Sequence, residues 1–80
     1  VAAAAAVAAE LMAGIPGMEV TRHETAPGIV NLVGRLDSGR PGRRLVFNGH
    51  LDTFPIGEDL GWTVPPTGGT LADGRLYGRG

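Results

Sequence analysis

The sequence has no cysteine and no lysine, and it contains no long hydrophobic run. Without cysteine the chain can form neither disulfides nor thiolate zinc sites. Seven basic and eight acidic residues give a net charge of −1, which argues against a nucleic-acid-binding surface. No segment approaches the roughly 18 apolar residues that span a bilayer. The alanine-rich stretch 1–9 has no basic region before it, and Glu10 follows it directly, unlike a signal peptide. We therefore expect no nucleic-acid or membrane partner and a cytoplasmic location.

Aromatic side chains are also scarce, with two Phe, one Trp and one Tyr in 80 residues. A chain of this length buries only about 60% of its unfolded surface, so its core would be thin. Fourteen Gly and six Pro leave room for short elements between many turns. The sequence begins at Val1 without Met and stops in a Gly-Arg-Gly run at Gly80. We expect residues 1–80 to be part of a larger protein.

The first half of the chain predicts one helix and three strands. Residues 1–13 are dominated by Ala and other good helix formers, with Gly14 as a C-cap and Pro16 to prevent continuation. We expect this helix to pack on a sheet, because its small side chains allow close approach. Residues 18–23 predict a strand, followed by a loop over 24–28 that contains Pro-Gly. Residues 29–36 and 43–48 predict two further strands, joined by a turn at 37–42 and paired antiparallel. Because residues 45–47 are continuously apolar, we expect the strand over 43–48 to be covered on both faces.

Beyond residue 50 the pattern changes to loops, and no helix is predicted. Loops beyond strand ends are where catalytic and binding residues concentrate. Asp73-Gly74 reads as a two-residue hairpin turn. Trp62 lies in a loop and either braces it or lines a pocket, with bracing the favoured interpretation. Other turns are expected at Pro55-Ile56-Gly57, Leu60-Gly61, Pro65-Pro66 and Gly68-Gly69.

The most informative stretch is Gly49-His50-Leu51-Asp52-Thr53, directly after the third predicted strand. In extended backbone, side chains i and i+2 point to the same face, so His50 and Asp52 would project side by side. An imidazole can ligate a metal or carry a proton, and a neighbouring carboxylate can fix its orientation. On its own, the pair also fits an ordinary strand-end His followed by a turn-forming Asp. His23, on the first predicted strand, is interpreted as a surface residue and left out of the site.

The downstream sequence favours the functional interpretation. The run from Gly49 to Thr53, then Trp62, Pro65-Pro66 and Gly69, then the segment 73–80 (Asp-Gly-Arg-Leu-Tyr-Gly-Arg-Gly) agree in order and spacing. Together they resemble the aminoacylase/acetylornithine deacetylase/succinyl-diaminopimelate desuccinylase family of zinc-dependent metallopeptidases and amidohydrolases, which includes glutamate carboxypeptidases. The second half of the chain matches the family's motifs closely. The first half matches only in the order of its predicted elements, a helix, two strands and then the strand that leads to His50. Pro66 departs from the pattern, since many relatives carry Phe there.

The resemblance implies an α/β fold: the N-terminal part of a zinc-exopeptidase-like catalytic domain, with a helix, mixed-sheet strands, a metal-site loop and a hairpin. Residues 1–80 would be a partial catalytic domain, truncated after Gly80. The resemblance implies that His50 is a ligand to one of two zinc ions, with Co²⁺ or Mn²⁺ as alternative metals. It also implies that Asp52 is an outer-sphere catalytic residue. The family's bridging Asp would fall at the third position after Gly80, and its Glu-Glu pair further on.

The implied activity is hydrolysis of an amide bond in an N-acyl amino acid or small peptide by a water that two zinc ions activate. The resemblance also implies a homodimer, mediated by a second domain. The segment alone is expected to be inactive, since a catalytic zinc normally takes about three protein ligands. Two alternatives stay open: a non-catalytic relative that uses the pocket for binding, and a small β-rich structural module. A phosphate site at 74–80 is disfavoured, because no helix start follows.

Overall fold

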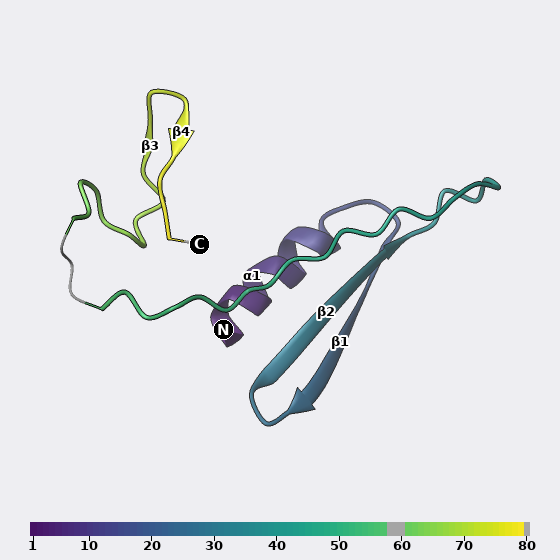
Figure 1. Ribbon diagram of the computed structural model, residues 1–80. Coiled ribbons are helices and arrows are strands. Elements are labelled where there is room, and N and C mark those ends of the chain that lie inside the picture. The colour runs from purple at the N-terminus through teal and green to yellow at the C-terminus, as the bar shows by residue number, and fades with distance from the viewer. Residues whose placement is uncertain (58–60, 80) are drawn as a thin grey trace.

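The computed structural model describes residues 1–57 and 61–79, and it contains one helix and two separate hairpins. Both sheets are two-stranded and antiparallel. Helix α1 lies along the first hairpin, and the segment after this hairpin runs back past α1 in an extended course up to residue 57 (Figure 1). The second hairpin follows at residues 71–76. Helix and strands occur together, as an α/β class requires, but the described residues form no mixed sheet. The elements are α1 (Ala2–Ala13), β1 (Met18–Ala26), β2 (Ile29–Leu36), β3 (Leu71–Ala72) and β4 (Arg75–Leu76).

Helix α1 confirms the prediction for residues 1–13 and begins one residue later. Its C-cap is Gly14, whose N–H donates to the Glu10 carbonyl at 3.0 Å, and Pro16 follows. Among the residues that the structure describes, no helix has the length and hydrophobicity needed to cross a lipid bilayer.

The helix packs on the β1–β2 hairpin, as its small side chains predict. Ala5 of α1 is 4% exposed and Val30 of β2 is 8% exposed. Gly34 permits close approach on β2: a Cβ there would lie 3.0 Å from Met18 Sδ and 3.2 Å from Met12 Sδ. The contact between α1 and the hairpin therefore combines the small residues Ala5 and Gly34 with Val30 and flexible methionine side chains.

Strand β1 is longer than predicted, and the loop expected over residues 24–28 is wrong. Only Pro27 and Gly28 lie between β1 and β2, with a register shift between Glu24 and Ala26. The Gly28 N–H donates to Glu24 Oε1 at 2.9 Å and stabilises this tight turn. The Pro-Gly pair thus marks a hairpin turn with strand on both sides.

The third predicted strand, residues 43–48, is not a strand in this structure, and its predicted pairing with residues 29–36 is wrong. Strand β2 pairs with β1. Leu45, Val46 and Phe47 are 77%, 74% and 88% exposed, so neither face is covered. The physical reason is the lack of a partner: among the described residues no strand pairs with residues 43–48, although the pairing of β2 with β1 uses only one edge of β2. High β-propensity alone does not make a strand without a partner.

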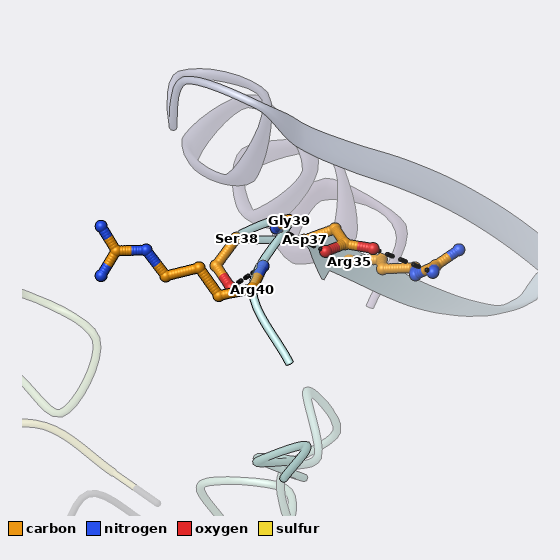
Figure 2. A network of polar contacts seen from close by, with 5 residues as sticks. All are labelled: Arg35, Asp37, Ser38, Gly39 and Arg40. Atoms are coloured by element: carbon orange, nitrogen blue, oxygen red, sulfur yellow. Dashed lines mark hydrogen bonds and ion pairs between the residues drawn. The ribbon is translucent and has the colours of Figure 1, made fainter. Parts of the chain in front are cut away.

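The predicted turn after β2 is held by its own side chains (Figure 2). Asp37 Oδ1 accepts from the Gly39 N–H at 2.8 Å, and Ser38 Oγ accepts from the Arg40 N–H at 3.2 Å. Arg35 Nη2 lies 3.4 Å from the Asp37 carboxylate, while the Arg40 side chain points away from it. Local hydrogen bonds of this kind are typical of Asp and Ser in turns.

The second hairpin, β3–β4, confirms the turn at Asp73-Gly74. Both residues have positive φ, 51° and 71°, as a two-residue turn of the primed type requires. The predicted turn at Pro65-Pro66 is also present, with the Gly68 N–H donating to the Pro65 carbonyl at 3.1 Å. The turn expected at Leu60-Gly61 includes Leu60, which lies outside the described residues.

The core of the described chain is small, and this predicts weak stability. Ala5 and Val30 are its only buried hydrophobic side chains. Burial of so few apolar groups does not offset the conformational entropy lost on folding. We expect the isolated 80-residue chain to show no cooperative unfolding transition by circular dichroism or calorimetry. A single sharp thermal transition would contradict this.

Candidate metal centre

His50 lies in the extended segment that follows the turn at 37–42, and one nitrogen of its ring is engaged. His50 Nδ1 lies 2.7 Å from the main-chain carbonyl oxygen of Asp52. A carbonyl oxygen can only accept, so Nδ1 must donate and carry the proton. In the neutral ring the lone pair is then on Nε2, which is the nitrogen left to bind a metal.

The Asp52 carboxylate lies beside the same nitrogen, with Oδ1 3.3 Å from His50 Nδ1. The two side chains therefore lie side by side, as i and i+2 positions of extended backbone predict. The shorter contact is to the main-chain carbonyl, so the carbonyl orients the ring and the carboxylate is a second, longer acceptor. The His50 and Asp52 side chains are 76% and 79% exposed. Their relative orientation thus depends on hydrogen bonds and not on packing.

An open groove of about 770 Å³ adjoins the pair. Helix α1 and strand β2 supply its apolar wall, including Met12 and Val30, and residues 48–52 form its polar edge. His50 and Asp52 border this shallow, open groove while their side chains remain largely exposed. Small-molecule sites commonly combine an apolar wall with a few polar groups in this way.

Arg79 is a residue that the sequence reasoning did not single out. Its Nη2 donates to Thr53 Oγ1, next to the His50-x-Asp52 pair and 26 residues earlier in the chain. The Arg79 main-chain N–H donates to the Pro66 carbonyl at 3.1 Å, and Pro66 is buried. No local pattern could reveal this link, since periodicity reports only neighbours along the chain.

Two other predicted residues have clear positions. His23 lies on β1 opposite Asn31 in the ladder and is exposed, in agreement with its interpretation as a surface residue. Trp62 is 39% exposed and lines an open pocket of about 640 Å³ together with Pro65 and Pro66. All the residues that line this open depression belong to the same loop as Trp62, so the arrangement fits both the bracing and the pocket-lining interpretation.

Residues 1–57 and 61–79 contain no group of three or more His, Cys, Asp or Glu side chains placed to hold a metal ion. The described residues therefore place the predicted ligand His50 beside the Asp52 carboxylate, with no cluster of further metal-ligating side chains around it. A zinc site takes three or four ligands, so the remainder would have to come from other residues.

Comparison with known proteins gives the context of this site. The chain is 51% identical over 53 residues to succinyl-diaminopimelate desuccinylase 2 of Ruegeria sp.. The matched residues make up 66% of this chain and 13% of that protein. It is 46% identical over 57 residues to the succinyl-diaminopimelate desuccinylase of Parvibaculum lavamentivorans, and this match covers 71% of this chain and 14% of that protein. The enzyme of the same name from Rhodospirillum centenum is 52% identical over 50 residues, which are 62% of this chain and 12% of that protein.

The chain belongs to the aminoacylase/desuccinylase family. It spans 13% and 14% of the length of the first two of these relatives. No family model and no solved structure matches the chain. Within the aminoacylase/desuccinylase family, the relatives named above are by name enzymes that remove a succinyl group from an amine.

Proposed function

We propose that this chain is part of a metal-dependent hydrolase that cleaves the amide bond of an N-acyl amino acid or small peptide. The observation that carries the proposal is the His50 ring, whose Nδ1 donates to the Asp52 carbonyl and whose Nε2 is left to bind a metal. This ring lies beside a groove, in a chain about half identical to succinyl-diaminopimelate desuccinylases over the matched residues. An ordinary strand-end histidine would need none of these features.

The residues present fit one part of a two-zinc site. His50 would hold one ion through Nε2, and the Asp52 carboxylate beside Nδ1 would increase the electron density that the ring offers. Zinc, with Co²⁺ or Mn²⁺ as alternatives, supplies when bound a Lewis acid that polarises the amide carbonyl and activates water. The family pattern assigns the bridging carboxylate and the general base to positions outside residues 1–80. The segment would therefore orient the metal, while other residues move the proton to the leaving amine.

The proposal includes the wider setting of the site. The substrate is a small N-acyl amino acid or peptide, and succinyl-diaminopimelate is the first candidate because of the names of the relatives. Residues 1–80 would form a partial catalytic domain of a homodimeric protein. The proposed location is the cytoplasm, with which the absence of cysteine from these 80 residues is consistent. The isolated segment would be inactive, because it offers one proposed ligand.

Metal removal tests the proposed function. The complete gene product is incubated with a chelator, assayed for release of amine from succinyl-diaminopimelate and from other N-acyl amino acids, and then supplied with Zn²⁺ or Co²⁺. We expect chelation to abolish hydrolysis and either ion to restore it. Hydrolysis that persists after the metal is gone would contradict the proposal. Metal binding with no hydrolysis of any N-acyl substrate would instead favour a non-catalytic relative.

A further inference from the structure

Arg79 joins three segments of the chain at one point. Its main-chain N–H donates to the Pro66 carbonyl at 3.1 Å, and its side chain donates to Thr53 Oγ1. Arg79 is half-buried, and its Nε is fully covered without a hydrogen-bond partner among the described residues. A buried donor without a partner is unfavourable, so the guanidinium is held in this orientation by its other contacts.

The contact with Thr53 continues to the His50 ring. The peptide group between Asp52 and Thr53 carries the carbonyl oxygen that accepts from His50 Nδ1 at 2.7 Å. Fixing the Thr53 side chain restricts rotation of this peptide group, because Thr is β-branched and stiff about its first side-chain torsion. A continuous series of contacts therefore runs from Arg79 through Thr53 and the Asp52 carbonyl to the imidazole.

We propose that Arg79 is a positioning residue that sets the orientation of His50 through Thr53. The inference rests on the proposed function, since orientation of the ring matters only if Nε2 binds a metal. The His50 and Asp52 side chains are largely exposed, so packing cannot fix them. A ligand that rotates freely binds metal more weakly, because binding must then stop that rotation.

The chemistry of the two side chains suits this role. Arg presents a rigid, planar set of donors that keeps its charge, so its contact with a hydroxyl has a defined direction. Thr53 is exposed, and its hydroxyl can be removed without opening a cavity in the small core. The main-chain bond from Arg79 to Pro66 does not depend on the side chain, so side-chain variants leave the link between the hairpin and the loop in place.

The test uses the complete gene product with matched variants. Thr53→Val keeps the β-branched shape and removes the hydroxyl, while Thr53→Ser keeps the hydroxyl. Arg79→Met removes the donors, and Arg75→Met, on β4 of the same hairpin, is the control. The measurements are Co²⁺ and Zn²⁺ affinity of the metal-free protein in competition with a chelator, the visible absorption spectrum of the Co²⁺ form, and kcat and KM separately.

We expect Thr53→Val and Arg79→Met to weaken Co²⁺ and Zn²⁺ binding by about 10-fold, the lower end of the range for loss of a group that hydrogen-bonds a metal ligand, because both act one contact further out, through the Asp52 carbonyl. The Co²⁺ spectrum should shift, and kcat should fall more than KM changes. Thr53→Ser should keep the metal affinity of the parent protein, because the hydroxyl is retained. Arg75→Met should match the parent protein in metal affinity, spectrum and kinetics. If Thr53→Val keeps the metal affinity and Co²⁺ spectrum of the parent protein, the positioning role is wrong. The same result for Arg79→Met, even if Thr53→Val binds metal more weakly, would also overturn it.

A fifth variant, His50→Ala, separates this inference from the proposed function. If His50→Ala loses metal while Thr53→Val does not, the positioning role is wrong and the proposed function stands. If His50→Ala binds metal as the parent does, His50 is not a ligand and both are wrong.

Discussion

The His50→Ala variant of the complete gene product is expected to lose bound metal and nearly all amide hydrolysis. The substitution removes the imidazole whose Nε2, opposite the nitrogen that contacts the Asp52 carbonyl, is the proposed metal ligand. Loss of a ligand should weaken metal binding by more than the roughly 100-fold that loss of an outer-sphere partner costs. Metal content by elemental analysis and turnover of an N-acyl amino acid, measured on the same preparation, test both effects.

His23→Ala is the matched control, because it removes an exposed imidazole from β1 at a position outside the proposed site. This variant should keep the metal content and turnover of the parent. If the two histidine variants behave alike and both retain metal and activity, the assignment of His50 as a ligand is wrong.

The Asp52→Asn variant should separate metal binding from turnover. The substitution keeps the main-chain carbonyl that accepts from His50 Nδ1, so much of the metal should stay bound. It removes the negative charge 3.3 Å from that nitrogen, and with it the electrostatic influence of the carboxylate on the ligand. We expect turnover to fall by roughly 100-fold, the upper end of what loss of an outer-sphere partner costs. Elemental analysis and steady-state kinetics on one preparation measure the two effects.

The control for Asp52→Asn is Asp37→Asn in the turn after β2. An asparagine there can still accept from the Gly39 N–H, so the turn shown in Figure 2 is preserved. The lost ion pair with Arg35 is exposed and contributes little to stability. Unchanged turnover in Asp52→Asn would show that the carboxylate has no catalytic role.

Local signals in the sequence predict the elements whose determinants are local. The alanine-rich run before Gly14 and Pro16 gives α1, and Asp73-Gly74 gives the second hairpin, because capping and turn chemistry act within a few residues. The third strand was predicted from the composition of residues 43–48 and is wrong. Strand formation depends on a partner in space, which composition does not report, and residues 43–48 pair with no strand among the described residues.

The candidate site divides in the same way. The adjacency of His50 and Asp52 follows from the two-residue period of extended backbone, so it could be predicted. Which acceptor takes the Nδ1 proton could not be predicted, because the main-chain carbonyl and the carboxylate of Asp52 compete within the same residue. The contact of Arg79 with Thr53 joins positions 26 residues apart, and no local spacing encodes it.

The exposed run Leu45-Val46-Phe47 has a consequence for the life of the chain in the cell. A short apolar segment of high β-propensity, with both faces open, is a template for strand pairing between chains and for aggregation. Arg43 and Arg44 precede it directly and place two like charges at its edge. Stacked copies would bring these charges together at the spacing of neighbouring strands, which opposes assembly. Charged residues that flank a β-prone segment in this way oppose its pairing with other chains.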